Sequence, residues 1–295
     1  MSTECTPIQM DFQGLGRRKV EAAFDGGHLS SEGGSLLLRE ADSRLGIVDR
    51  LAACFTDYRN QDAVEHRVAE LLRQRIFGLA LGYEDLNDHD SLRRDVLLAL
   101  ASGKKDIEGK ERRREEDKGI PLASKSSLNR LELTPEDANR ESRYKKIVYR
   151  GRDIEDLMVA LFVESFKEAP EEIVLDFDAT DIPLHGGQEG RFFHGYYKNY
   201  CYLPLYVTCG DELLVAKLRP SNMDASAGTV RVLKRLVKAI RARFPKVRII
   251  LRGDSGFARE AIMAWCEANG VYYVLGLAKN ARLNQIIDGA MDRAK

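Results

Sequence analysis

The segment from Ile173 to Asp181 most constrains how this chain can fold. It begins as an apolar, β-branched run, which predicts a strand, and then fills with carboxylates. Side-chain alternation gives the strand an apolar face of Ile173, Leu175 and Phe177 and a polar face of Asp176, Asp178 and Thr180. Two acids on one face repel each other, so such a strand often holds a cation. The alternative interpretation is a strand that simply ends in a polar loop.

Composition limits the class of protein. The 295 residues suffice for one large domain or two modest ones. The 46 Lys and Arg residues balance 46 Asp and Glu residues, so local clusters must decide whether nucleic acid is a partner. The five cysteines are scattered without a Cys-x-x-Cys pair, which favours reduced thiols over a zinc site or disulfides. Without a signal peptide or a long apolar run, we expect a cytoplasmic protein with no membrane partner.

Residues 1–168 are predicted to form a mainly α-helical region. Its strongest helical pattern covers 62–81, with Asp62 as the expected N-cap and Gly82 as the stop, and further helices are expected over 91–100 and 154–166. The charged run 104–118 predicts a mobile, solvated loop because it has no apolar face to bury.

The segment 121–130 is rich in serine, lysine, asparagine and arginine, the residue types that contact DNA phosphates. Lys125 and Arg130 are therefore candidate DNA-binding residues. The alternative is that this segment only caps a helix. If it does contact phosphates, the region 1–168 is a DNA-binding region.

Residues 169–295 show a different pattern, with the element order β-β-β-α-β-α-β. The expected strands are 173–181, 200–209, 212–218, 247–254 and 271–276, with helices over 225–244 and 259–269. A tight turn joins antiparallel strands, whereas a helical crossover joins parallel ones. The order therefore predicts an α/β fold class with a ribonuclease-H-like mixed sheet, in which the first and fourth strands are neighbours.

In that sheet Asp178 and Asp254 end adjacent parallel strands, so their carboxylates should face one another. Such a pair suits Mg²⁺, with Mn²⁺ as a substitute, and two such ions about 3.5–4 Å apart can promote attack on a phosphodiester. Strand-end acids without a metal are also common. Asp176 shares this face and is an alternative metal-shell residue, but we expect it to bond nearby amides; for Asp181 we expect a turn.

The run from Phe192 to Lys198 is aromatic and ends in a cation. His194, Tyr197 and Lys198 are candidate DNA contacts, because aromatic rings stack on unpaired bases and cations bind phosphates. Arg252, close to the second aspartate, is a further candidate. The alternative is that the tyrosines are ordinary strand residues.

Several segments together resemble one family. They are 178–181, 188–197, 201–206 and 251–257, with 72–90 and 124–132 in the first half. These segments resemble the 1380 family of bacterial insertion-sequence transposases, which are DDE enzymes with two aspartates and a glutamate on a ribonuclease-H-like fold. The resemblance implies that Asp178 and Asp254 are the first two catalytic acids. It also implies Mg²⁺-dependent cleavage and strand transfer, terminal inverted repeats and target DNA as double-stranded partners, and a homodimer on DNA.

One departure concerns the third acid, which the family carries in a Tyr-x-x-Arg-x-x-x-Glu pattern. The glutamates after Asp254 are Glu260 and Glu267, and neither lies in that pattern. We therefore expect a C-terminally truncated copy that is weakly active or inactive. Two alternatives remain: a non-catalytic DNA-binding remnant that regulates transposition, and a ribonuclease-H-like nuclease.

Overall fold

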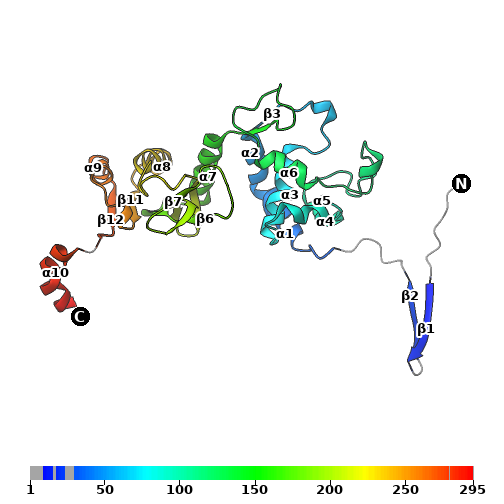
Figure 1. The fold of residues 1–295 in the computed structure, drawn as a ribbon, viewed down its shortest axis with the longest axis horizontal. Coiled ribbons are helices and arrows are strands. Elements are labelled where there is room, and N and C mark those ends of the chain that lie inside the picture. Colours follow the sequence, from blue (N-terminus) through cyan, green and yellow to red (C-terminus); the bar gives the residue numbers. More distant parts are fainter. Residues whose placement is uncertain (1–8, 16–17, 24–29, 279, 295) are drawn as a thin grey trace. The chain divides into compact units, whose positions relative to one another are not determined.

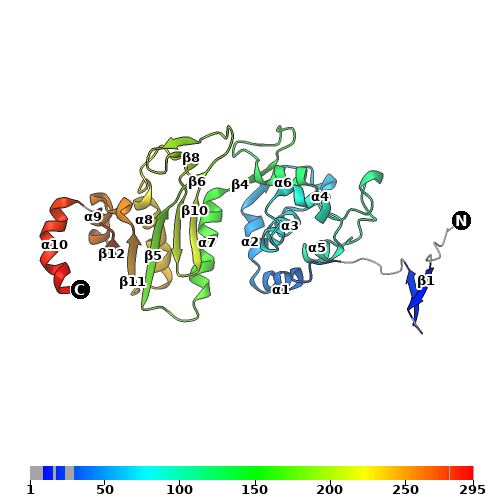
Figure 2. The same cartoon turned by 60° about the horizontal axis from the view of Figure 1, so that its bottom comes forward.

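The computed structural model describes residues 9–15, 18–23, 30–278 and 280–294. The chain divides into two compact units, residues 1–150 and 151–295 (Figures 1 and 2). The division falls before helix α7 (Gly151–Ser165), not at 168/169 as the sequence predicts. The reason is that Val159, Phe162 and Val163 of α7 are buried in the core of the second unit.

The first unit is mainly helical, as predicted. Its helices are α1 (Ser35–Leu45), α2 (Ile47–Ala53), α3 (Val68–Ala80), α4 (His89–Leu92), α5 (Val96–Ala101) and α6 (Lys125–Glu132), with 3-10 turns η1 (Gln61–Ala63), η2 (Leu86–Asp88) and η3 (Glu115–Asp117). Two antiparallel pairs accompany them: β1 (Gln9–Leu15) with β2 (Arg18–Ala23), and β3 (Phe55–Asp57) with β4 (Ile147–Tyr149). Helix α3 supplies Leu71 and Leu72 to one buried cluster and Phe77 to another, so it joins the two halves of this core.

Helix α3 begins at Val68, so the predicted start at Asp62 was wrong. Residues 61–63 form only a 3-10 turn, and Arg67 is the residue that precedes the helix in an extended conformation. Its backbone N–H donates to Glu70 Oε2 at 2.9 Å, which satisfies one of the unpaired donors of the first turn. At the other end Gly82 has a φ of 96°, which agrees with its predicted role as the stop.

Two more segments of the first unit differ from the predictions. The helix expected over 91–100 is two short helices, because Asp95 is extended and its carboxylate accepts the N–H of Leu98 at 2.6 Å, which starts α5. The segment 104–118 is not fully solvated. The side chain of Arg112 is only 11% exposed, because the segment folds against other parts of the first unit.

The second unit is built on a five-stranded mixed sheet with the order β10-β9-β5-β11-β12. The strands are β5 (Glu172–Ala179), β9 (Leu205–Cys209), β10 (Glu212–Lys217), β11 (Arg248–Gly253) and β12 (Tyr272–Leu275). Strand β9 runs antiparallel to β5 and β10, whereas β5, β11 and β12 are parallel. The predicted adjacency of the first and fourth strands is thus confirmed by the pairing of β5 with β11.

A smaller sheet with the order β6-β8-β7 follows β5 in the chain. It contains β6 (Ile182–Pro183), β7 (Phe192–His194) and β8 (Asn199–Tyr202). The single strand predicted over 200–209 is therefore two strands, β8 and β9, in two different sheets. The break falls at 203–204, where Pro204 has no N–H to donate to a ladder.

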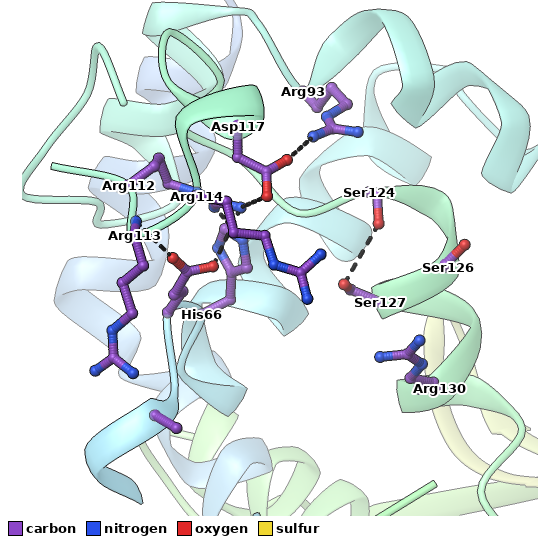
Figure 3. A pocket seen from close by; sticks show the side chains of 12 residues that line it. His66, Arg93, Arg112, Arg113, Arg114, Asp117, Ser124, Ser126, Ser127 and Arg130 are labelled. Atoms are coloured by element: carbon purple, nitrogen blue, oxygen red, sulfur yellow. Dashed lines mark hydrogen bonds and ion pairs between the residues drawn. The ribbon is translucent and has the colours of Figure 1, made fainter. Parts of the chain in front are cut away.

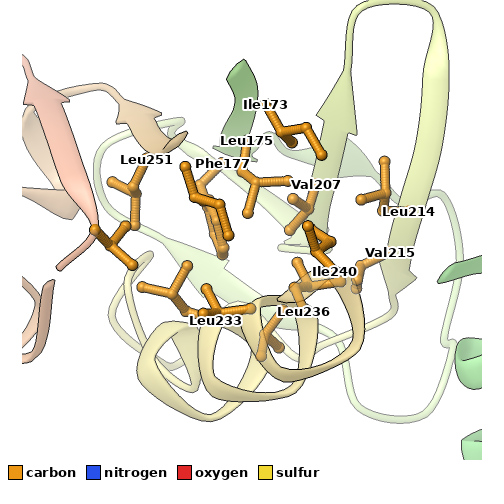
Figure 4. Packing of buried hydrophobic residues seen from close by; sticks show 14 of the residues in the cluster. Ile173, Leu175, Phe177, Val207, Leu214, Val215, Leu233, Leu236, Ile240 and Leu251 are labelled. Carbon is orange, nitrogen blue, oxygen red and sulfur yellow. The ribbon is translucent and has the colours of Figure 1, made fainter. Parts of the chain in front are cut away.

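Helices cover one face of the five-stranded sheet. They are α7, α8 (Thr229–Arg243) and α9 (Glu260–Ala268), while α10 (Ala281–Ala294) follows β12. In Figure 4, Leu175, Phe177 and Leu251 of the sheet meet Leu233 and Leu236 of α8. Each fully buried side chain of this kind contributes about 1.5–3 kcal/mol. Helix α8 starts at Thr229 rather than Ala225, after Gly228 with a φ of 82°.

The alternation predicted for the strand at 173–179 is confirmed. Ile173, Leu175 and Phe177 are buried against the helices, whereas Asp178 is exposed on the opposite face. Among the described residues, that opposite face also exposes Tyr272 and Val274 of β12. In the described part of the chain, no helix is long and apolar enough to cross a bilayer.

Candidate active site

The strand register brings Asp178 and Asp254 together. The parallel pairing of β5 with β11 ends at Phe177 opposite Gly253, so the next residue on each strand is an aspartate. Both aspartates are exposed; Asp178 is the next-to-last residue of β5, and Asp254 directly follows β11. The structure therefore places the two aspartates at neighbouring positions near the carboxyl ends of adjacent parallel strands.

Asp254 is held by the turn that follows it. Its Oδ1 accepts the N–H of Gly256 at 2.8 Å and caps the 3-10 turn η4 (Ser255–Phe257). The turn buries Phe257 completely, and a Cβ added at Gly253 would lie 3.1 Å from the Phe257 Cβ. Glycine at 253 thus permits the close packing that fixes the direction of the chain at Asp254.

Asp176 lies on the same face as Asp178 but has a different partner. Arg252, directly opposite in the register, makes a bidentate ion pair with it, and Arg252 Nη2 lies 2.6 Å from Asp176 Oδ2. In the described part of the chain, no ion pair joins Asp178 to a cation. Of the two carboxylates on this strand face, Asp178 is the one that remains open to a ligand.

Tyr197 lies within reach of the carboxylates. Its hydroxyl donates to the carbonyl oxygen of Ala179 at 3.3 Å, directly after Asp178. Burial raises the pKa of Tyr197, and the negative charges of Asp181, Asp178 and Asp254 raise it further. The phenol therefore stays protonated at neutral pH, and its hydroxyl acts as a hydrogen-bond donor.

The hairpin of β7 and β8 presents the other predicted contacts. The rings of His194 and Tyr197 lie 4.9 Å apart. Lys198 is exposed, has a φ of 55°, and closes the turn by donating its N–H to the His194 carbonyl at 2.8 Å. Asn199 Nδ2 donates to Asp181 Oδ2 at 3.0 Å, so Asp181 is engaged where the chain enters the small sheet. Together with exposed Tyr196, the hairpin forms an aromatic and basic surface beside the aspartates.

The first-unit candidates Lys125 and Arg130 both belong to α6. Lys125 Nζ lies 2.8 Å from Asp90 Oδ2 and 3.0 Å from Asn87 Oδ1, so its charge is partly matched. The Arg130 guanidinium lies over the ring of Tyr144, 5.4 Å from its centroid. Of the two, Arg130 has the more open charge.

Asp178 and Asp254 offer two carboxylate ligands to a divalent cation. Carboxylate oxygens are the ligands that Mg²⁺ and Mn²⁺ prefer, and Mg²⁺ commonly keeps several waters. Within the described ranges, no group of three or more His, Cys, Asp or Glu side chains could hold a metal. Glu260 lies in the first turn of α9, and Glu267 accepts from the Tyr273 hydroxyl at 2.7 Å. Neither completes the site.

The first unit contains a second site that its sequence does not predict, a pocket of about 480 Å³ (Figure 3). It is lined by arginines from the segment 112–114, serines from 124–127, and the buried His66. The arginines of 112–114 lie in the charged run 104–118, but a run of charges is more often solvated than folded around a histidine, so the sequence did not indicate a pocket there.

A search of curated sequences finds no significant match. Three solved structures of the Mos1 mariner transposase match parts of the chain. They are the catalytic domain (12% identity, TM-score 0.28, covering 48% of this chain and 69% of that one), the paired-end complex with the left transposon end (14%, 0.26, 80% and 67%) and the paired-end complex with Mn (12%, 0.26, 90% and 85%). The family model described as transposase DDE domain group 1 matches residues 12–295, and the chain belongs to this family.

Proposed function

We propose that this protein is the transposase of an insertion sequence, which cleaves and transfers DNA at the element ends on a ribonuclease-H-like sheet. Family membership supports the class of reaction. The single observation that carries the site is the register of β5 with β11, which sets Asp178 beside Asp254 at the strand ends. The order of the five strands, with two antiparallel and two parallel neighbour pairs, supports the proposed sheet type.

Asp178 and Asp254 would hold the metal, Mg²⁺ or Mn²⁺. When bound, such an ion makes water a stronger nucleophile and offsets the charge that develops on a phosphodiester. The chain's own residues prepare the site: the Gly256 N–H orients one oxygen of Asp254, and Arg252 engages Asp176 so that it does not pair with Asp178.

DNA binding is proposed for the residues around the site and in α6. His194, Tyr197 and Lys198 form the surface next to the aspartates, where stacking and phosphate contacts would hold a DNA end. Arg252 engages Asp176 through Nε and Nη2, which leaves its Nη1 donors for a phosphate. The partners are double-stranded terminal repeats and target DNA, bound by a homodimer, with Lys125 and Arg130 on the backbone.

A second candidate function is a DNA-binding protein that regulates transposition without cleavage. It is favoured by one observation, that no third metal-binding side chain joins Asp178 and Asp254 among the residues described. For the same reason we expect cleavage by this chain to be slow, because two carboxylates hold a divalent cation less firmly than three.

Metal binding tests the site independently of activity. We expect Asp178→Asn and Asp254→Asn each to weaken Mn²⁺ binding, followed by electron paramagnetic resonance, by at least about tenfold. Asp211→Asn is the matched control, since Asp211 is an exposed aspartate in the turn between β9 and β10, at the other end of the sheet, and this variant should bind Mn²⁺ as the unaltered chain does. If Asp178→Asn bound Mn²⁺ with unchanged affinity, the proposed centre would be wrong.

A DNA assay separates the two candidate functions. The intact chain is incubated with Mn²⁺ and a labelled duplex carrying an element end. Nicking above the level of Asp178→Asn supports the transposase. Specific binding of the end with no nicking at any Mn²⁺ concentration supports the regulator.

A further inference from the structure

The pocket in the first unit carries an excess of positive charge. Five arginines and two carboxylates line it, so the arginines exceed the pocket's own acids by three, and Arg114 also lies 3.5 Å from the exposed Glu116 outside the pocket. Asp117 pairs with Arg93 at 3.1 Å and lies 3.6 Å from Arg112, and Glu65 lies 3.3 Å from Arg112. Both acids are thus engaged at the floor of the pocket.

The contacts of His66 show that the floor lacks a hydrogen-bond acceptor. His66 is 8% exposed; its Nε2 lies 2.5 Å from Arg112 Nη1, and its Nδ1 lies 3.3 Å from Lys104 Nζ. Arginine and lysine only donate, and a neutral imidazole accepts at one nitrogen alone. One of the two contacts therefore sets a donor against a donor. In addition, the Nε atoms of Arg112 and Arg93 are buried without a partner among the described residues.

His66 itself does not add to the charge. Burial, followed by the charges of Lys104 and Arg112, lowers the pKa of His66 to about 3. The ring is therefore neutral at physiological pH, and the attraction for an anion comes from the arginines.

The opposite wall is the start of α6. Ser124 precedes the helix but makes no side-chain bond to its first-turn N–H groups, and its hydroxyl instead lies 3.4 Å from that of Ser127. A helix start with unpaired N–H groups attracts anions. In Figure 3, the guanidinium of Arg114 extends toward Ser127, and Arg130 lies close to Ser127 on α6. The donors thus converge from two separate segments of the chain.

We propose that this pocket binds a backbone phosphate of DNA, with Arg114, Arg130 and the first turn of α6 as donors and Arg112 beneath them. The volume, about 480 Å³, lies in the range of small-molecule sites and leaves room for the sugars on either side of a phosphodiester. The identification of DNA as the source of the phosphate rests on the proposed transposase function. The pocket lies wholly in the first unit and is separate from Asp178 and Asp254.

The test measures how binding of a duplex depends on salt. A fluorescein-labelled DNA duplex of arbitrary sequence is titrated with the intact chain at several salt concentrations. Each lost phosphate contact should reduce the slope of log K against log salt by about 0.9. We expect this reduction for Arg114→Gln and for Arg130→Gln. Arg44→Gln is the matched control, because Arg44 is an exposed arginine of the same unit that pairs with Glu40, and it should leave the slope unchanged.

Ser126→Asp separates binding from folding. A carboxylate in the first turn of α6 favours the helix start, so the stability of the variant should be kept or raised, while its charge repels a phosphate in the pocket. Stable protein with weakened duplex binding supports the proposal. Stable protein with unchanged affinity and slope would overturn it.

Inorganic phosphate identifies the source of the anion. If Arg130→Gln and Ser126→Asp lose binding of inorganic phosphate by calorimetry but keep the full salt slope with DNA, the pocket serves a small phosphate and the DNA proposal fails. The proposed metal centre is tested separately, because Asp178→Asn should bind the duplex with the same slope as the unaltered chain.

Discussion

Neighbours decide the roles of individual residues in this protein. Asp176 and Asp178 are two residues apart on one strand face, yet Arg252 lies opposite the first and no cation of the described residues pairs with the second. His66 is a comparable case, since a histidine between Arg112 and Lys104 remains a neutral residue in a cationic pocket. In both places a partner distant in the sequence sets the charge that remains for a ligand.

The pKa of His66 predicts how stability depends on pH. Burial first, and then Lys104, lowers it to about 3 from 6.5, so between these values the unfolded chain binds a proton that the folded chain does not. The free energy of unfolding should therefore fall as the pH falls through this window, by up to about 1.4 kcal/mol per unit from this group. His66→Gln does not titrate, so its stability should fall less steeply from about pH 6.5 to 4.5 in urea unfolding experiments. Parallel pH profiles for the two proteins would contradict the burial of an uncharged histidine.

At the scale of elements, the five-stranded sheet has two antiparallel and two parallel strand pairs, and the aspartates lie near the carboxyl ends of one parallel pair, β5 and β11. The helical crossovers through α8 and α9 make β11 and β12 parallel to β5, and the register then brings Asp254 level with Asp178. In the first unit the comparable element is the segment 104–118, whose arginines fold over His66. A backbone hydrogen bond closes the loop formed by this segment: the N–H of Gly119, the residue directly after it, donates to the Gly109 carbonyl at 3.1 Å.

Substitutions at Gly109 and Gly119 test how tightly this loop packs against the rest of the first unit. Both have positive φ, 71° at Gly109 and 78° at Gly119, which costs alanine roughly 1–2 kcal/mol. A Cβ at Gly109 would also lie 2.6 Å from the Ile120 backbone nitrogen, whereas a Cβ at Gly119 meets nothing within 4 Å. We expect Gly109→Ala to destabilise the first unit more than Gly119→Ala in thermal unfolding, and to weaken duplex binding. Equal losses for the two variants would show that the segment does not pack against Ile120.

At the scale of the whole molecule, the chain consists of two units that each have a core. The first unit packs its helices around α3, and the second packs α7, α8 and α9 on one face of the sheet. Asp178 and Asp254 belong to the second unit and the arginine pocket to the first. We therefore expect that phosphate binding in the pocket and metal binding at the aspartates can be separated by mutation.

The division at 150/151 predicts where the chain can be cut. A fragment of residues 151–295 keeps Val159, Phe162 and Val163 in its core, whereas a fragment of residues 169–295 lacks them. Each lost side chain removes about 1.5–3 kcal/mol. We expect the longer fragment to unfold cooperatively in urea and the shorter one to be strongly destabilised, as measured by circular dichroism. Equal stability of the two fragments would mean that α7 is not part of this core.

The predictions that succeeded rest on local patterns and connection rules. Alternation of apolar and acidic residues in 173–179 depends only on the geometry of one strand, and it holds. The adjacency of β5 and β11 follows from the crossover rule and is also observed. The predicted start of α3 at Asp62 was wrong. Residues 61–63 form only a 3-10 turn, and Glu65, three residues after Asp62, accepts the backbone N–H of Arg113 at 3.0 Å.

The sequence by itself determined the two faces of β5, the adjacency of β5 and β11, and the two aspartates near the carboxyl ends of these parallel strands. Tertiary structure alone decided that Arg252 pairs with Asp176 rather than Asp178, that α7 completes the second core, and that arginines gather around His66. The physical reason is that periodicity and connection rules depend on neighbours along the chain. Ion pairs, buried donors without acceptors and pockets depend instead on side chains that meet only after the chain has folded.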